Sequence, residues 1–187
     1  EQVYNPAFRK EYIITNALDK TCFKKVYELC EELEISKSTM DKDMKQIRID
    51  LEKYDLKIES NLEIGLHIEG KESQIRTFLY DYLVNKITED NVNISTLYES
   101  YSPILKYLDN KDLNFINDTY NKLIAIHQSD IKLSAIILTS IWLTRVRKGH
   151  IYEINHVDKT AKFSIIHIFI NDLINQYDLK ISRNEFH

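Results

Sequence analysis

Apolar residues recur along positions 35–54 at a spacing that predicts an α-helix. Steps of four and three residues alternate between them, so they share one face of a helix. A side-chain oxygen of Ser36 or Ser38 can accept one of the unpaired N–H groups of the first turn and so begin the helix. The apolar positions are Met40, Met44, Ile47, Leu51 and Tyr54.

The opposite face of this predicted helix is polar. At about 100° per residue it carries Ser38, Lys42, Lys45 and Ile49. Gln46 and Lys53 lie on one flank of this face, and Asp41 and Glu52 lie on the other. A helix with a buried back and a front of hydroxyls, lysines and an amide suits the major groove of DNA. The other interpretation is an ordinary solvated amphipathic helix, so the neighbouring elements must decide.

Two further helices are predicted before this one. Residues 7–18 follow Pro6, a residue that favours the first turn of a helix. Residues 22–33 form the second helix, which Thr21 can cap. A short break at 34–37 then leads into the helix described above. Two helices joined by a tight turn, with a third before them, indicate a helix-turn-helix.

Apolar and polar residues alternate in the next two segments, Leu56–Ser60 and Leu66–Gly70. Alternation with a period of two predicts β-strands, and Asn61–Gly65 supplies the turn between them. A hairpin directly after a helix-turn-helix is the wing of a winged helix. We therefore predict a winged helix-turn-helix domain with a small β hairpin over residues 1–70.

The remainder of the chain is predicted to be helical. A polar, broken segment at 89–103 predicts a linker, so residues 71–102 form a connecting helix and linker between two domains. Residues 103–187 then form an all-α domain, in which 131–146 is apolar nearly all round and is expected in the middle of a bundle. The helices expected after residue 70 cover 72–87, 103–108, 112–127, 131–146, 159–177 and the start of one at 181–187.

Composition agrees with a helix-rich chain of one or two domains. The 187 residues include only three glycines and two prolines, and 43% of them are hydrophobic. No apolar run reaches the length of a membrane span and no signal segment opens the chain, so a cytoplasmic location is expected. The chain stops inside a helical pattern, and we expect it to be a piece of a longer protein.

The net charge of −4 gives no general positive field for nucleic acid. Residues 1–70 alone carry 11 Lys and Arg against 15 Asp and Glu. Contact with DNA must therefore come from a locally basic face. The residues expected to provide it are Ser36, Lys37, Ser38, Thr39, Lys42, Lys45, Gln46 and Arg48.

Acidic residues on the same helix offer a competing arrangement. Asp41, Asp43, Asp50 and Glu52 can pair with these cations along the helix surface and leave no site for phosphate. We therefore expect the chain alone to bind DNA no more tightly than about 10⁻⁵ M at physiological salt. A different class of function also stays open, an oligomerisation module whose winged helix has lost its contact with DNA.

Catalytic and metal-binding patterns are missing from the sequence. It has no glycine-rich phosphate loop, nucleophile elbow or paired-carboxylate motif, so an enzyme is not expected. Its histidines form no metal-ligand spacing, so neither a metal nor another cofactor is expected. They are weak candidates for accepting a phosphoryl group, and for His167 a hydrogen-bonded place in the core is the alternative. The four candidates are His127, His150, His156 and His167.

The segment 29–44, LCEELEISKSTMDKDM, resembles the helix-turn-helix of the BglG/LicR/MtlR-type regulators. The segment 65–76, GLHIEGKESQIR, resembles the wing of the same family and the start of the following helix. The resemblance implies a bacterial DNA-binding transcription regulator of carbohydrate utilisation that depends on the phosphotransferase system. Such proteins carry phosphotransferase-system regulation domains (PRDs) after the DNA-binding part. The implied partners are DNA, the phosphocarrier proteins of that system and a second copy of the chain.

A weaker resemblance to one such regulation domain covers 136–151 and 181–185. It implies a mainly α fold, with a PRD-like helical bundle after the winged helix. The family places its first phospho-accepting histidine seven residues before the arginine matched by Arg145, where this chain has Leu138, and its second beyond His187. A leucine cannot accept a phosphoryl group, so phosphorylation is expected elsewhere in the parent protein or not in this domain.

Two relatives of this family bear on the function. The Mga/AtxA-type virulence regulators combine the same parts and are an alternative assignment. The RNA antiterminators read RNA with a separate small N-terminal β domain. No strand-rich segment precedes the predicted winged helix in this sequence, so antitermination is not expected.

Overall fold

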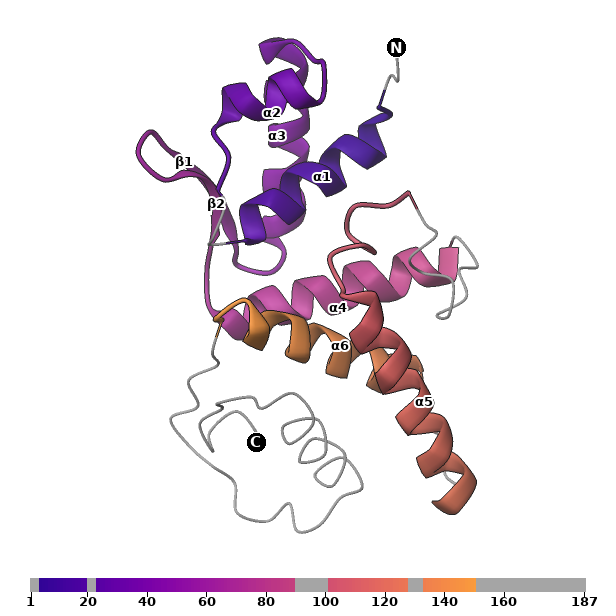
Figure 1. The fold of residues 1–187 in the computed structure, drawn as a ribbon. Helices are drawn as coiled ribbons and strands as arrows, with labels where there is room; N and C mark the ends of the chain where they lie inside the picture. The colour runs from indigo at the N-terminus through magenta and orange to yellow at the C-terminus, as the bar shows by residue number, and fades with distance from the viewer. Residues whose placement is uncertain (1–3, 20–22, 90–100, 128–132, 151–187) are drawn as a thin grey trace.

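The computed structural model describes residues 4–19, 23–89, 101–127 and 133–150. Helices dominate this part of the chain, and a single hairpin stands beside the first three of them (Figure 1). This arrangement confirms the predicted winged helix-turn-helix followed by helices. The elements in chain order are α1 (Pro6–Leu18), α2 (Val26–Glu32), α3 (Lys37–Glu52), β1 (Lys57–Asn61), β2 (Gly65–Glu69), α4 (Glu72–Glu89), α5 (Asn110–His127) and α6 (Leu133–Arg147).

Helices α1 and α3 begin where the sequence predicted, each at a residue whose side chain caps the first turn. Asn5 accepts a hydrogen bond from Phe8 N through Oδ1 at 2.8 Å, and Pro6 is the first helical residue of α1. Ser36 Oγ accepts from Thr39 N at 3.2 Å, so Ser36 rather than Ser38 is the cap of α3. The helix-turn-helix therefore follows from caps and periodicity that the sequence displays.

The start of the second helix was predicted wrongly. Helix α2 begins at Val26 rather than at residue 22, because the segment before it is extended and pairs with the hairpin. Leu66 N donates to the carbonyl of Lys24 at 2.8 Å. The carbonyl of Lys24 is directed at the wing and not at the N–H group four residues later, as it would be in an α-helix. The predicted cap, Thr21, lies outside the described residues.

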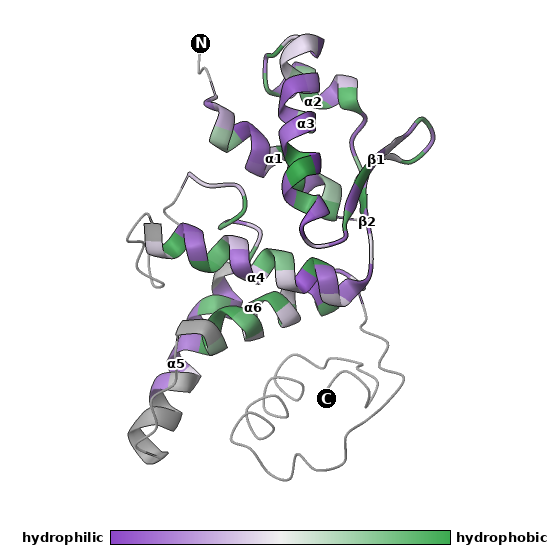
Figure 2. Cartoon of the chain, turned by 180° about the vertical axis from the view of Figure 1, so that it is seen from behind, coloured by the Kyte–Doolittle hydropathy of each residue, from purple (hydrophilic) through white to green (hydrophobic). Residues whose placement is uncertain are grey.

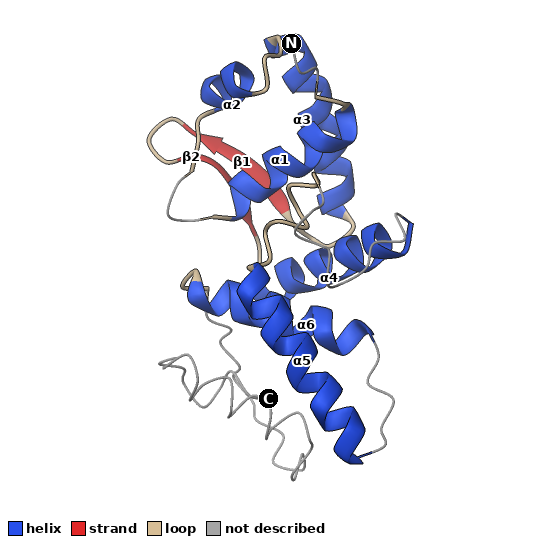
Figure 3. Cartoon of the chain, turned by 45° about the vertical axis from the view of Figure 1, so that its right-hand side comes forward, coloured by secondary structure: helices blue, strands red, loops and turns tan. Residues whose placement is uncertain are grey.

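The wing is the antiparallel pair of β1 and β2, drawn red in Figure 3. Ile58 lies opposite Ile68 and Ser60 opposite Leu66. Its turn is held by Asn61, whose Oδ1 accepts hydrogen bonds from Glu63 N at 2.8 Å and Ile64 N at 3.3 Å. The predicted strands and turn are thereby confirmed.

One continuous core runs from the winged helix into the following helices. Helices α4 and α6 lie side by side below the winged helix, and hydrophobic residues line much of α6 (Figures 1 and 2). The expectation that α6 is buried all round needs one correction, because the side chain of Leu138 is 50% exposed. The segment 103–108 is a set of turns and not the short helix expected. The helices expected at 159–177 and 181–187, and most of the linker at 89–103, lie outside the described residues.

A buried arginine links three of these elements. Arg145 of α6 is 1% exposed and binds the carboxylate of Glu72 at the start of α4, with Nε–Oε1 and Nη2–Oε2 distances of 2.9 and 2.6 Å. Its Nη1 donates to the carbonyl of Leu18 at the end of α1, at 3.1 Å, and to the Tyr107 hydroxyl at 3.0 Å. Arg76 also binds Glu72, with Nε–Oε1 2.9 Å. Helix α6 is thus tied to the winged helix through charged hydrogen bonds as well as apolar contact.

Acidification is expected to weaken the fold through Glu72. Burial alone raises the pKa of this carboxyl, but the hydrogen bonds and charges of Arg145 and Arg76 outweigh it, so the pKa lies below the usual 4.5. A carboxylate with a lowered pKa stabilises the folded state fully above its unfolded pKa, and the contribution is lost as the pH falls through the folded pKa. Urea midpoints measured from neutral pH down to about pH 3 should therefore fall more steeply for the wild type than for Glu72→Gln. Parallel curves for the two proteins would count against this assignment.

No helix among the described residues is both long enough and apolar enough to cross a membrane.

Candidate nucleic-acid interface

Helix α3 has a fully buried back. Met40, Ile47 and Leu51 are 0% exposed and Met44 is 4% exposed, as the sequence predicted. The residues on the opposite side of a 3.6-residue helix must then face outward, and Ile49 among them is 45% exposed. We call this outward surface the α3 front: Ser38, Lys42, Lys45, Gln46, Ile49 and Lys53.

The acidic residues on one flank of α3 pair with helix α1. Arg9 binds Asp43 through two hydrogen bonds, Nε–Oδ2 at 2.7 Å and Nη2–Oδ1 at 3.1 Å. Lys10, the next residue of α1, forms an ion pair with Asp50, which lies about two turns after Asp43 on α3. The hydrogen bond to Asp43 raises the pKa of the Arg9 guanidinium, and partial burial lowers it. The hydrogen bond and the charge of Asp43 prevail, so the pKa lies above its usual value. Two carboxylates of α3 are therefore neutralised from the side and do not face outward.

Two lysines of the α3 front, Lys42 and Lys45, keep their charge available. Within the described part of the chain, Lys42 and Lys45 are exposed and form no ion pair. Asp43 therefore pairs with α1 and not along α3, whereas Asp50 binds Lys10 of α1 and also contacts residues of its own helix. Lys53, which the sequence list of DNA contacts omitted, adds a further cation; its Nζ lies 3.8 Å from Asp50, which Lys10 already binds.

Some of the predicted polar contacts on α3 are hydrogen-bonded to one another, and others are exposed. Ser36 and Thr39 share a hydrogen bond between their hydroxyls at 3.0 Å, and Ser36 also caps the helix. Ser38 and Lys37 are exposed. Gln46 is exposed as well, and its amide donates a long bond of 3.3 Å to Asp50. Of the predicted contact residues, Ser38, Lys42, Lys45 and Gln46 thus lie along one side of α3.

Arg48 lies in a different setting from the other predicted contacts. It lines a groove of about 350 Å³ between α3 and the wing, together with the acidic residues Glu52, Asp55 and Glu59. A phosphate that approached Arg48 would meet these carboxylates. Arg48 is therefore the weakest of the predicted cations for binding DNA.

The wing carries little positive charge toward its tip. Leu62 is 91% exposed and Ile64 is 51% exposed, with the acidic Glu63 between them. Tyr27 of α2, 58% exposed, is a further large apolar side chain at the surface of the winged helix. The charge that can meet phosphate therefore lies on α3 and not on the wing tip.

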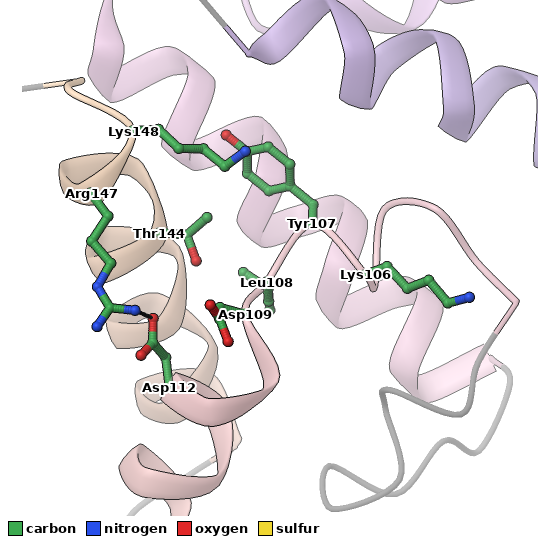
Figure 4. Close-up of a pocket in the computed structure, with 8 residues that line it drawn as sticks. All are labelled: Lys106, Tyr107, Leu108, Asp109, Asp112, Thr144, Arg147 and Lys148. Carbon is green, nitrogen blue, oxygen red and sulfur yellow. Dashed lines mark hydrogen bonds and ion pairs between the residues drawn. The ribbon is translucent and has the colours of Figure 1, made fainter. Parts of the chain in front are cut away.

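A separate pocket of about 600 Å³ lies between the start of α5 and the end of α6 (Figure 4). Arg147 forms an ion pair with Asp112 in its wall. Lys148 Nζ binds Asp19 Oδ2 at 2.6 Å, and Asp109 adds another carboxylate. Because carboxylates balance the cations, this pocket offers no concentrated positive charge for a nucleic acid.

The four histidines considered as phosphoryl acceptors lie in different parts of the chain. His150 follows α6 and is 4% exposed, so a phosphocarrier could reach its ring only after a rearrangement. His127 is the last residue of α5, and His156 and His167 lie outside the described residues. The described residues contain no cluster of three or more His, Cys, Asp or Glu side chains suited to a metal ion.

The N-terminal part of the chain is similar to a known DNA-binding domain. Residues 8–83 match the Mga helix-turn-helix domain. The match runs from α1 into α4 and so includes the whole wing.

A longer stretch is similar to a probable licABCH operon regulator of Bacillus subtilis (strain 168). The two are 30% identical in an alignment of 131 residues that covers 64% of this chain and 20% of that protein's length. This chain therefore spans about a fifth of the relative. None of the solved structures matches the chain.

Proposed function

We propose that this chain is part of a DNA-binding transcription regulator and that α3 enters the major groove of DNA. The Mga helix-turn-helix match supports the DNA-binding part of the proposal, and the similarity to an operon regulator supports the regulatory part. In this docking the lysines of the α3 front contact phosphates, and Lys45 and Gln46 are long enough to reach base edges.

The observation that carries the proposal is the pairing of Asp43 and Asp50 with helix α1. An acidic chain can approach a polyanion only where its own carboxylates are turned away or neutralised. Arg9 and Lys10 do this on one flank of α3, and Lys42 and Lys45 project from the neighbouring surface without an ion pair among the described residues. The result is a locally basic strip on a protein of net charge −4.

The finer part of the proposal is control of carbohydrate utilisation through the phosphotransferase system. The relative's name, an operon regulator, and the resemblance of residues 136–151 to a PRD support it. In this proposal residues 103–187 form the regulatory part, 71–102 connect it to the winged helix, and the parent protein is a homodimer that phosphocarrier proteins modify. Leu138 stands half-exposed where a PRD has its first histidine, so the modified residue lies elsewhere. A virulence regulator of the Mga/AtxA type is the alternative within the same class.

A second candidate function is an oligomerisation module without DNA contact. The exposed apolar side chains of Tyr27, Leu62 and Ile64 favour it, because exposed apolar side chains on a small domain often belong to a protein interface. The two candidates differ in their response to salt, since contacts with phosphate release counterions and apolar contacts do not.

A salt titration of DNA binding separates the two functions. The whole chain is titrated into a labelled random-sequence duplex, and a plot of log K against log salt is expected to have a slope of several. The double variant Lys42→Gln/Lys45→Gln should reduce the magnitude of the slope by about two and weaken binding at low salt about 100-fold, because each lysine contributes about one released counterion.

The matched control is Lys106→Gln/Lys111→Gln, which removes two exposed lysines that lie outside the winged helix. This control should bind as the wild type does. A slope near zero for the wild type, or equal losses in the two double variants, would reject α3 as the DNA-binding element and favour the oligomerisation module.

A further inference from the structure

Ile49 is an apolar side chain whose neighbours along the α3 front are lysines, with the exposed carboxylates of Asp41 and Glu52 on one flank. It is 45% exposed and stands four residues after Lys45 and four before Lys53. Four residues correspond to a rise of about 6 Å, so each lysine lies roughly one turn away on the same face. Lys42 lies two turns before Ile49, also on the α3 front.

The surroundings of Ile49 distinguish it from a protein-docking residue. The other large hydrophobic side chains that stand exposed in the described residues are all on other elements: Tyr27, Leu62, Ile64, Tyr101 and Leu138. The centre of a protein interface is depleted in lysine and brings several apolar side chains together. Ile49 has the reverse setting, one apolar side chain among lysines, so a polyanion with an apolar group on its surface fits it better.

The major groove of DNA offers such a group. Thymine carries its C5-methyl in the groove, between phosphates that attract lysine on either side. Isoleucine suits a contact with that methyl because its β-branched side chain is restricted to few rotamers in a helix and loses little freedom on binding. A helix that places lysines against phosphates would set the residue between them against the base edges.

We propose that Ile49 contacts the C5-methyl of a thymine and gives this winged helix a preference for a T·A pair at one position. This inference rests on the proposed binding of DNA by α3 and adds to it the chemical group that is read. Phosphate contacts by Lys42 and Lys45 fix the position of the helix without selecting a sequence. Ile49 then supplies a selection that is independent of charge.

The test removes the methyl and the isoleucine separately. A random-sequence duplex pool is first enriched with the wild-type chain, then amplified with either thymidine or deoxyuridine, which lacks only the C5-methyl. The wild type is expected to bind the deoxyuridine duplex about three- to tenfold more weakly, the scale of one lost apolar contact. Ile49→Ala should bind the thymidine duplex with a similar loss and should not distinguish the two duplexes.

The control is Leu62→Ala, which shortens the most exposed apolar side chain of the wing and should keep the full discrimination. Because Ile49 is 45% exposed, its replacement leaves the core unchanged, and an unaltered salt slope verifies that the phosphate contacts persist.

Several results would overturn the inference. If the wild type binds both duplexes equally with a steep salt slope, DNA binding stands and the reading of thymine fails. Discrimination that survives in Ile49→Ala assigns the methyl contact to another residue. If Ile49→Ala changes the sedimentation of the chain without changing DNA binding, Ile49 is a protein contact. A wild type with no salt-dependent binding removes the proposed function and this inference together.

Discussion

Replacing Arg145 by methionine is expected to lower the free energy of unfolding by about 3–5 kcal/mol, the range for breaking a buried ion pair by removing one partner. The guanidinium is 1% exposed and serves Glu72, the Leu18 carbonyl and the Tyr107 hydroxyl at once. Methionine fills much of the same volume but donates no hydrogen bond, so all three acceptors lose this donor. Urea unfolding followed by the fluorescence of Trp142, the single tryptophan and a residue of α6, measures the change.

The control for this prediction is Lys106→Met, which makes a comparable change at an exposed position. It should alter stability by less than about 0.5 kcal/mol, as surface substitutions usually do. The double variant Arg145→Met/Glu72→Gln should recover part of the loss, because a neutral amide is less costly to leave without its cation than a carboxylate. Equal stabilities for Arg145→Met and Lys106→Met would mean that the buried cluster contributes nothing to the fold.

The winged helix was predictable from the sequence because its signals are local. The apolar stripe of α3, the cap at Ser36 and the alternation in Leu56–Ser60 each depend on residues a few positions apart. Local patterns of this kind agreed with one another, which is the condition under which a sequence specifies its fold clearly. The extended segment before α2 was missed because the bond that fixes it joins Lys24 to Leu66, far along the chain.

The role of Arg145 was missed for the same physical reason. Arg145 stands in the last turn of an apolar helix, where a cation is favourable without any partner from another element. The structure adds that its partner is Glu72, at a sequence separation of 73 residues. A charged residue within an otherwise apolar turn is the one signal that could have suggested burial with a partner.

The candidate DNA surface was predictable in outline but its electrostatics were not. The helical wheel assigns Lys42 and Lys45 to the outward face, and the burial of the opposite face agrees with this. Whether Asp43 binds a cation of its own helix or one of another depends on how α1 crosses α3. Arg9 and Lys10 stand side by side in the sequence without indicating this pairing, since it arises only when the two helices pack.

Replacing Gly65 by alanine is expected to destabilise the fold by about 2–4 kcal/mol, because two separate effects combine. Gly65 has φ +108°, a conformation that residues with a Cβ rarely adopt. An added Cβ would also lie 2.9 Å from the carbonyl oxygen of Lys24 and 3.0 Å from that of Phe23, both of them backbone atoms. The oxygen of Lys24 accepts the bond from Leu66 N, so relief of the clash must pull the extended segment away from the wing.

Gly149→Ala is the matched control for this prediction. Gly149 has φ +78° and ends α6, but an added Cβ there meets no atom within 4 Å. The same substitution should therefore destabilise by only about 1 kcal/mol, the part that comes from the backbone conformation alone. The difference between the two variants in the free energy of urea unfolding measures the cost of the steric clash between the wing and the segment before α2. If both glycines give the same small loss, that approach adds nothing to stability, and the wing is held by its apolar side chains alone.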